Sequence, residues 1–357
     1  RCSSRCCKRI KEIGGKKLTI KDIAKESGYS VSTVSRVLNN RRDVSPEAKK
    51  RISEIVAAYN FIPNNNAKHL KQSTSKNIAV LVKGTSNMLF ANIVEEVQKM
   101  LEETKYSAEV CYMDEDKNEV EQALILCRER KPMGILFLGG NPSNFKEKYE
   151  QIEVPGVLIT NCGKELPFEN LSSVSVDDIA AAKQAMDYLL ENKHKNIGIL
   201  GGDITLSHTS QQRYLGCLES FKKHGLEFDK EKYYENCRFS FDSAYRAMVR
   251  LLEKAPDITA IFAMADVTAI GAIRALKDKG FNVPEDISVI GFDGIELADY
   301  YNPKLTTIKQ PARELAIRGV EILFNFIDFQ AGSIHETVNV DLITGESVKK
   351  LTSGGEG

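Results

Sequence analysis

The chain has 357 residues, of which 42% are hydrophobic and 27% charged, and this is the composition of an ordinary globular protein rather than a disordered one. Its longest apolar stretch, residues 260–273, is interrupted by Asp266 and is shorter than the ~20 residues that span a bilayer, which excludes a transmembrane helix. At ~100–200 residues per domain, this length predicts two or three domains.

The formal net charge of zero conceals an asymmetry along the chain. Residues 1–76 carry 18 Lys and Arg against 6 Asp and Glu, a net of +12, whereas residues 77–357 carry 31 against 43, a net of −12. A basic end on an acidic body is typical of a segment that meets a polyanion, although a solvated charge run would look the same. Residues 1–17 lack the apolar segment of an export signal, so we expect a cytoplasmic protein with a basic tail that is disordered or non-native.

The polar and apolar pattern of residues 18–59 predicts three short helices. Thr19 is the candidate N-cap of the first helix, and Gly28 ends it where a tight turn needs positive φ. Ser30 is the candidate cap of the second helix, and Ser45, followed by a proline, opens the third. Two short helices around a glycine turn, backed by a third, predict a helix-turn-helix unit.

The second of these helices, residues 31–38, has one apolar face and one face of small and polar side chains. The polar face consists of Val31, Ser32, Thr33, Ser35, Arg36 and the following Asn39. Small residues let a helix enter a DNA groove, hydroxyls bond phosphates, and arginine reaches guanine edges. The pattern therefore favours DNA binding, while a plain three-helix bundle with a polar face stays open.

In residues 77–357, short apolar runs alternate with amphipathic helical patterns. The predicted buried strands are 78–82, 110–113, 135–138, 157–159, 197–200, 261–264 and 287–292, and the predicted helices include 93–101, 180–190, 211–221, 243–252, 267–276 and 314–326. Nearly continuous apolar strands indicate parallel sheets covered on both faces. This alternation of strands and helices is too long for one ordinary doubly wound sheet, so the sequence predicts two α/β lobes.

Nothing in this body indicates catalysis, so we expect no enzyme activity, no cofactor and no metal site. The glycine pairs at 139–140 and 201–202 lack the rest of a phosphate-binding loop. The eight cysteines contain no CxxC pair, and no histidine stands at metal-ligand spacing. Asp178, at the start of a predicted helix, is interpreted as a helix cap rather than an acid–base residue.

The amino-acid sequence of the N-terminal segment resembles the headpiece of the lactose/galactose repressor family. The matching stretches are LTIKDIA at 18–24 and SVSTVSRVLN at 30–39, followed by YNFIPN at 59–64 and AKHL at 67–70, which are similar to the end of the headpiece and the hinge helix. The resemblance implies that Val31, Ser32 and Arg36 read bases while Thr33, Ser35 and Asn39 hold phosphates. It places Leu70 as a wedge in the minor groove. It also places Thr19, Ser30, Asn64 and Ala67 at the DNA.

The body resembles the effector domain of the same family, which is similar to periplasmic sugar-binding proteins. The marks are SNMLFA at 86–91, RYLG at 213–216, FAMAD at 262–266, VIGFDG at 289–294 and LTTIKQP at 305–311. The implied domains are a headpiece at 18–63, a hinge and linker at 64–76, and a two-lobed core at 77–357. Lobe 1 would take about 77–175 plus 307–335, and lobe 2 about 176–306 plus 336–357, with crossings near Val176, Thr306 and Glu336.

The resemblance also implies a ligand site between the lobes. Leu89 and Phe90 would form its apolar wall, Arg213 would bond two ligand oxygens at once, and Asp266 and Asp293 would accept hydroxyl hydrogen bonds at strand ends. Asn161 and Phe292 complete the expected set. A core position for Phe90, a solvated helix position for Arg213 and a helix cap for Asp266 stay open.

The resemblance thus implies a transcription regulator, a repressor, that binds a near-palindromic operator as a homodimer under the control of a sugar or related metabolite. Ala265 and the pair Thr160 and Asn161 depart from common family residues, which leaves the effector open. The family also uses nucleobases, phosphosugars and a phosphorylated carrier protein as effectors. Residues 351–357 lack leucine heptads, which favours a dimer over a tetramer. Two alternatives remain: a regulator whose co-repressor is a phosphorylated carrier protein, and a transport-type sugar-binding protein.

Overall fold

The computed structural model describes residues 20–38, 44–59, 76–84 and 87–351. The chain divides into two compact units, residues 1–73 and 74–357, and each is described by itself. Thr19, Asn39, Asn64, Ala67 and Leu70 lie outside the described residues, so their predicted contacts with DNA remain predictions.

The described residues of the first unit form three helices, α2 (Ile20–Ser27), α3 (Val31–Leu38) and α4 (Pro46–Ala58). They pack around Ile23, Val34 and Ile52, all of which are fully buried. Gly28 has the positive φ of +77° that its turn requires. The hydroxyl of Ser30 accepts from the Thr33 amide at 3.2 Å and that of Ser45 from the Ala48 amide at 3.3 Å, so both predicted caps are confirmed.

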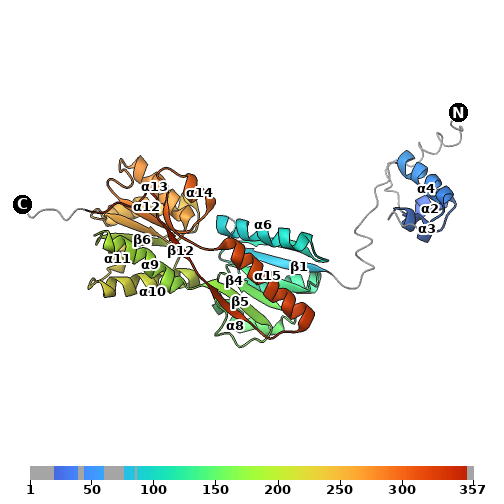
Figure 1. Cartoon of the computed structure of the whole chain (residues 1–357), viewed down its shortest axis with the longest axis horizontal. Coiled ribbons are helices and arrows are strands. Elements are labelled where there is room, and N and C mark those ends of the chain that lie inside the picture. Colours follow the sequence, from blue (N-terminus) through green and yellow to red (C-terminus); the bar gives the residue numbers. More distant parts are fainter. Residues whose placement is uncertain (1–19, 39–43, 60–75, 85–86, 352–357) are drawn as a thin grey trace, which may run out of the picture. The chain divides into compact units, whose positions relative to one another are not determined.

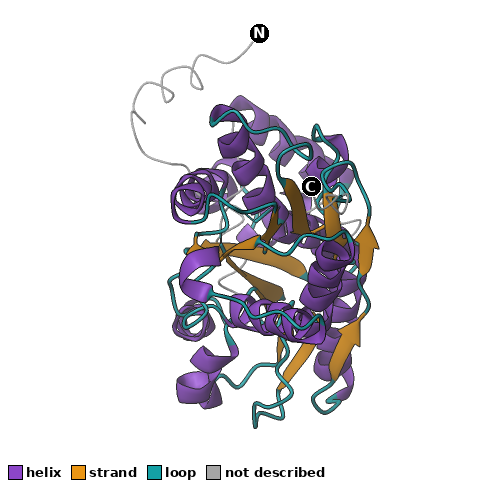
Figure 2. Ribbon diagram, turned by 90° about the vertical axis from the view of Figure 1, so that its left-hand side faces the viewer, coloured by secondary structure: helices purple, strands orange, loops and turns teal. Residues whose placement is uncertain are grey.

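The second unit holds two six-stranded sheets (Figures 1 and 2). The first sheet has the order β11-β5-β4-β3-β1-β2 and is parallel throughout. Its strands are β1 (Asn77–Lys83), β2 (Ser107–Met113), β3 (Gly134–Leu138), β4 (Gly156–Ile159), β5 (Leu171–Val176) and β11 (His335–Val338). The helices of this lobe are α6 (Met88–Glu102), α7 (Glu119–Glu129), α8 (Pro142–Lys148), the 3-10 turn η1 (Tyr149–Gln151) and α15 (Ala312–Phe329).

The second sheet has the order β12-β10-β9-β8-β6-β7, and only its edge strand β12 runs antiparallel to its neighbour. Its strands are β6 (Ile197–Gly201), β7 (Tyr234–Asn236), β8 (Ala260–Ala263), β9 (Ser288–Asp293), β10 (Thr306–Lys309) and β12 (Asp341–Ile343). The helices are α9 (Asp178–Glu191), α10 (His208–Lys223), α11 (Lys230–Tyr233), α12 (Phe241–Lys254), α13 (Asp266–Asp278) and α14 (Glu296–Tyr300). In Figure 2 the helices flank the strands, as buried parallel sheets require.

Two of the predicted crossings between the lobes are wrong by a few residues. Thr306 lies inside β10 of the second sheet and Glu336 inside β11 of the first, so the chain passes between lobes after Lys309 and again after Val338. The second lobe therefore includes residues 307–309, and the first includes 336–338. These short strands are rich in threonine and charged residues, so their apolar signal is too weak to set the boundary from sequence.

Candidate functional site

The polar face of α3 is displayed at the surface of the first unit. Val31, Ser32 and Arg36 are exposed, and Thr33 and Ser35 are half-buried. Here the hydroxyl of Ser30 also lies 2.7 Å from that of Ser32 and 2.9 Å from that of Thr33, a cluster at the start of the helix. The described part of the predicted DNA-reading surface is thus brought together on one accessible helix face, with Val34 and Val37 buried behind it.

A cavity of about 610 Å³ lies where the two lobes of the second unit meet. Its walls come from segments that follow the carboxyl ends of strands in both sheets, the place where open α/β sheets bind ligands. The first lobe supplies Lys83, Asn87, Leu89, Phe90, Asp114, Glu115, Asp116, Asn141 and Asn161; the second supplies Asp203, Leu206, His208, Thr209, Arg213, Arg238, Phe239, Asp293 and Gln310.

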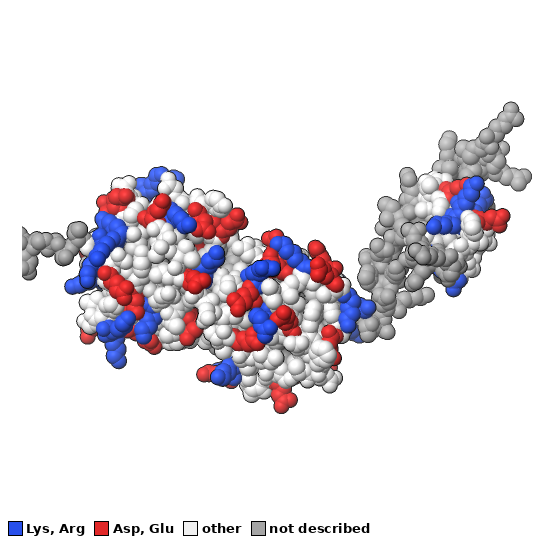
Figure 3. Space-filling model, in the orientation of Figure 1, with Lys and Arg blue, Asp and Glu red and all other residues white. Residues whose placement is uncertain are grey.

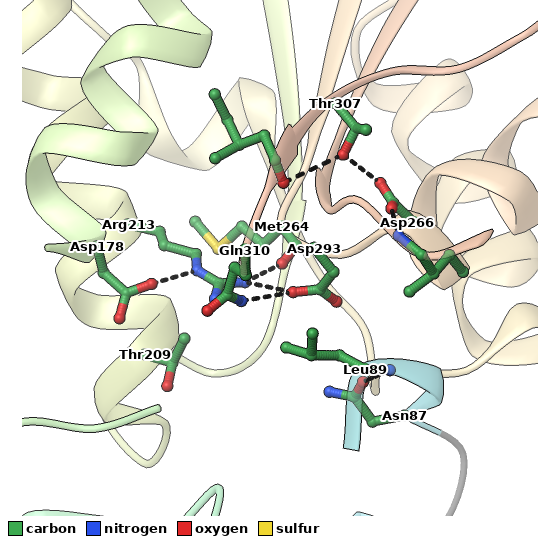
Figure 4. A network of polar contacts seen from close by, with 12 residues as sticks. Asn87, Leu89, Asp178, Thr209, Arg213, Met264, Asp266, Asp293, Thr307 and Gln310 are labelled. Carbon is green, nitrogen blue, oxygen red and sulfur yellow. Dashed lines mark hydrogen bonds and ion pairs between the residues drawn. The ribbon is translucent and has the colours of Figure 1, made fainter. Parts of the chain in front are cut away.

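Arg213 is the organising residue of the second lobe's wall (Figure 4). It projects from α10, and its Nε donates to Asp178 Oδ1 at 2.8 Å while Nη1 donates to the Met264 carbonyl. Its guanidinium stacks on the Phe292 ring at 3.6 Å from the centroid. Nη1 also lies 4.0 Å from Asp293 Oδ1. The alternative of a solvated helix residue is therefore wrong, because Arg213 is buried and ion-paired.

Asp293 and Gln310 form the adjoining part of this wall. Gln310 Nε2 donates to Asp293 Oδ1 at 2.9 Å, and both side chains are buried. Burial raises the pKa of Asp293 to about 6, although Arg213 opposes the shift. The backbone of Asp293 has a φ of +113°, and Thr160, which also lines the cavity, has +79°. Strained residues of this kind are concentrated at ligand sites.

The first lobe contributes an apolar wall and an amide. Leu89 and Phe90 line the cavity from the first turn of α6, whose N-cap Asn87 accepts from the Leu89 amide at 2.9 Å. Asn161 is buried, and its Oδ1 accepts from Thr209 of the other lobe at 3.2 Å. Phe90 was predicted to form part of the ligand site, with a core position as the alternative. It does both, since it packs in the hydrophobic core and also lines the cavity.

Two of the predicted ligand contacts, and one predicted cap, need correction. Asp266 does not line the cavity: its carboxylate accepts from Thr307 Oγ1 at 2.6 Å and from the Ile295 amide at 2.9 Å, so it anchors the segment after Asp293. Phe292 is fully buried and lies beneath Arg213, so it supports the guanidinium without facing the cavity. The α9 cap is Asp177, whose side chain accepts from the Ala180 amide at 2.9 Å, whereas Asp178 pairs with Arg213.

The sequence did not identify Gln310 as a site residue. Its Oε1 is buried and has no hydrogen-bond partner among the described residues, although the side chain lines the cavity. A buried acceptor without a partner is costly, and a ligand donor would satisfy it. Its only sequence signal was its place after a strand in the LTTIKQP stretch.

The basic side chains of the cavity are already neutralised. Lys83 Nζ lies 2.8 Å from Glu119 Oε2, Arg213 pairs with Asp178, and Arg238 contacts three carboxylates of the first lobe. Burial lowers the pKa of His208, which keeps this imidazole neutral at neutral pH.

Among the described residues, no group of three or more His, Cys, Asp and Glu is arranged to hold a metal ion. No helix there is long and apolar enough to cross a membrane.

These features define a class of protein: a DNA-binding regulator in which a helix-turn-helix unit precedes a two-lobed core like that of periplasmic binding proteins. Residues 19–64 match the bacterial regulatory proteins of the lacI family, and residues 186–348 match the periplasmic binding protein-like domain. The HTH-type transcriptional regulator MalR of Clostridium butyricum is 37% identical over 92% of this chain and 99% of its own length. The chain belongs to the lacI family of bacterial transcription regulators.

Other relatives agree with this assignment. The HTH-type transcriptional repressor PurR of Mannheimia succiniciproducens is 30% identical over 93% of this chain and 99% of its own length. Among solved structures, a complex of the transcriptional regulator CelR with cellobiose is 25% identical, with a TM-score of 0.67 over 92% of this chain and 99% of its own. A lac repressor dimer bound to operator, 23% identical, has the same fold, with a TM-score of 0.70 over 94% of this chain and 100% of its own.

Proposed function

We propose that this regulator is a repressor that binds a near-palindromic operator as a homodimer and is controlled by a neutral sugar held between its lobes. The observation that carries the proposal is the 610 Å³ cavity, in which Arg213, Asp293 and Gln310 present donors and acceptors opposite Leu89 and Phe90. Ligand pockets combine a mostly apolar wall with a few fixed polar groups. Sugar hydroxyls both donate and accept hydrogen bonds, which suits this mixture.

The charge of the cavity supports a neutral effector over an anionic one. Each Lys and Arg among its described lining residues already has a carboxylate partner, and Asp203 and Asp293 add further negative charge. A phosphorylated sugar is normally held by arginine or lysine free to make charge-assisted bonds. Phosphosugars are therefore disfavoured here.

The size of the cavity supports more than a single small ring. Its volume lies in the middle of the range of ~300–1,000 Å³ typical of ligand pockets. The CelR complex contains cellobiose, a disaccharide. We therefore place disaccharides first among the candidate effectors, ahead of nucleobases.

On the DNA side, the proposal assigns base reading to Val31, Ser32 and Arg36 on the exposed face of α3. Thr33 and Ser35, beside them, would bond phosphates. A homodimer displays two such helices related by two-fold symmetry, and for this reason the operator should be a near-palindrome. The protein would act in the cytoplasm, where its operator lies.

The test is a ligand screen on the full chain with an operator obtained by selection from random duplexes. Thermal unfolding is measured with neutral disaccharides, monosaccharides, sugar phosphates and nucleobases, and each ligand that raises the melting temperature is then titrated against the operator complex. We expect a neutral saccharide to stabilise the protein by about 2.7 kcal/mol at 100 times its Kd and to change operator affinity. Stabilisation by sugar phosphates or nucleobases alone would contradict the proposal.

A pair of variants tests whether the effect passes through the cavity. Asp293→Asn removes a buried carboxylate that faces the ligand, and it should abolish the effector response while operator binding without effector stays close to that of the parent chain. The matched control is Asp242→Asn, which removes an exposed carboxylate paired with Arg246 on the same lobe. Normal effector binding by Asp293→Asn would show that the effector site is wrongly assigned, although the protein would still be a DNA-binding regulator.

A further inference from the structure

A cluster of charges joins the two lobes at the pocket. Arg238 follows β7 in the second lobe, and Asp114, Glu115 and Asp116 follow β2 in the first. Arg238 Nη2 lies 2.6 Å from Asp114 Oδ1 and 2.8 Å from Asp116 Oδ2, and its Nε donates to Glu115 Oε1. All four residues line the cavity, so the cluster joins the two lobes at the wall of the pocket.

Both halves of the cluster are shaped by local hydrogen bonds. The amide of Arg238 donates to Ser243 Oγ at 2.9 Å, which fixes the turn before α12. The amide of Asp116 donates to Asp114 Oδ1 at 3.0 Å and that of Lys117 to the Asp114 carbonyl at 3.1 Å, which holds the acidic loop in a turn. The same amide and Arg238 keep the pKa of Asp114 below its ordinary value. These groups are therefore preorganised to meet.

The ion pairs of this cluster are weak enough to break when the two lobes move apart. The side chains of Arg238, Asp114 and Asp116 are 51%, 53% and 77% accessible, whereas that of Glu115 is 28% accessible, and exposed ion pairs are individually weak. Three carboxylates gathered on one guanidinium nevertheless form a network, and they repel one another once the arginine leaves. Added salt screens both effects.

We infer that Arg238 and the carboxylates of residues 114–116 form an ionic latch that holds the two lobes together over the pocket and sets how readily it opens. The role given to the pocket rests on the proposed function. Two uncharged bridges, Asn141 Nδ2 to the Leu206 carbonyl at 2.8 Å and Thr209 to Asn161, also cross between the lobes, so the latch is the salt-sensitive part of this contact.

The latch is tested by amide hydrogen exchange on the full chain, without effector or operator, at low and high salt. Arg238→Gln should speed exchange about fivefold or more in the peptides covering residues 114–118 and 236–240, although only the second contains the substitution. In the parent chain, added salt should also speed amide exchange in both peptides. In Arg238→Gln this acceleration by salt should be lost. The control is Arg246→Gln, which removes an exposed guanidinium whose partner, Asp242, lies on the same helix.

A charge exchange separates the latch from a purely local effect. Arg238→Glu should give fast exchange in both peptides, and adding Glu115→Arg should slow exchange again in part, because Asp114 and Asp116 still face position 238. If Arg238→Gln left the 114–118 peptide like that of Arg246→Gln, or if adding Glu115→Arg did not slow exchange at all, the latch would be refuted. Because no effector is present, failure of the sugar screen would refute the proposed function without changing this result.

Discussion

Arg213 is held from several sides by groups that do not depend on a ligand. Asp178 and the Met264 carbonyl accept its hydrogen bonds, and the Phe292 ring lies under its guanidinium. Removing one partner of a buried ion pair leaves an unpaired charge and destabilises a protein by about 3–5 kcal/mol. Asp293, 4.0 Å away, accepts from Gln310 at Oδ1, and a carboxylate has further lone pairs that can accept from ligand hydroxyls.

This availability should make effector binding depend on pH. The pKa of Asp293, raised to about 6 by burial, means that the group takes up a proton as the pH falls through about 6. Ligand hydroxyls that donate to the carboxylate favour its ionised form, so affinity should decrease below pH 6, by up to about tenfold per unit. Calorimetric titration of the effector between pH 5 and 8 measures this.

A second titratable group in the cavity calls for a control. His208 lines the same cavity, and burial lowers the pKa of its imidazole below the ordinary value. A His208→Gln variant should keep the decrease in affinity below pH 6. If His208→Gln instead removed the decrease, the histidine and not Asp293 would be the group that controls binding.

On α3, the exposed arginine and the neighbouring hydroxyl should have separable effects on DNA binding. Arg36→Ala should weaken operator binding by about 1–3 kcal/mol and relax the base preference at one position, because arginine contacts base edges bidentately. Thr33→Ala should weaken binding to all sequences alike, because phosphate contacts carry no base information. Affinities for every single-base variant of the operator distinguish the two. An unchanged base preference in Arg36→Ala would mean that α3 is oriented differently on DNA.

At the scale of elements, the packing of α9 against α10 sets the position of Arg213. A Cβ at Gly216 on α10 would lie well inside van der Waals distance of the Ile179 carbonyl on α9, so an alanine there must push the helices apart. Gly216→Ala should therefore lower the free energy of unfolding by about 1–3 kcal/mol and weaken effector binding, since Arg213 lies one turn earlier. Denaturant unfolding and effector titration measure the two effects.

The control for this substitution is a glycine with free space around it. A Cβ added at Gly332 would meet no heavy atom within 4 Å, and the backbone there has no positive φ, so Gly332→Ala should change stability by less than about 0.5 kcal/mol. Equal destabilisation by both substitutions would show that helix packing at Gly216 is not the cause.

The elements that sequence patterns missed are the polar strands. The apolar strands were predicted to within a few residues, but β5 (Leu171–Val176) was not predicted, because serine alternates with apolar residues there. All six of its residues are buried, and the hydroxyls of Ser172 and Ser173 accept from the amides of Ile334 and Gly163. Such a strand is stable only where neighbouring segments satisfy its hydroxyls, which a local pattern cannot show.

The site was predictable to a similar extent. Asp293 lines the cavity at a strand end, as the strand-end rule implied, and Arg213 lines it from α10, where the family resemblance placed it. Asp266 stands at the end of a neighbouring strand and satisfies the same rule, yet its carboxylate points to Thr307 and Ile295. The two aspartates stand in similar sequence contexts, but Asp266 is turned away from the cavity by hydrogen bonds from residues 29 and 41 positions away. No local sequence pattern carries that information.

At the scale of the whole molecule, positive and negative charges are distributed unequally along the chain. Within residues 77–357, however, they are mixed. Residues 77–357 carry a net charge of −12. Yet on the face shown in Figure 3 their acidic and basic side chains are interspersed. Such a core offers DNA no broad positive surface there. The phosphate contacts should therefore come from residues 1–76, with their net charge of +12.

This assignment predicts a steep dependence of operator binding on salt. The logarithm of the affinity should fall linearly with the logarithm of salt concentration, with a slope of roughly −0.9 per phosphate contact, because bound cations are released from DNA. The tail at 1–17 carries 7 of the 18 basic residues and a net charge of +6, and residues 18–76 carry the other +6. A chain shortened to begin at Leu18 separates the two contributions. If the headpiece makes the contacts, as the exposed face of α3 indicates, the shortened chain keeps the slope of the parent chain at every operator sequence. A slope that falls by half on shortening would assign the contacts to the tail, and binding that is insensitive to salt in both chains would contradict phosphate binding by this segment altogether.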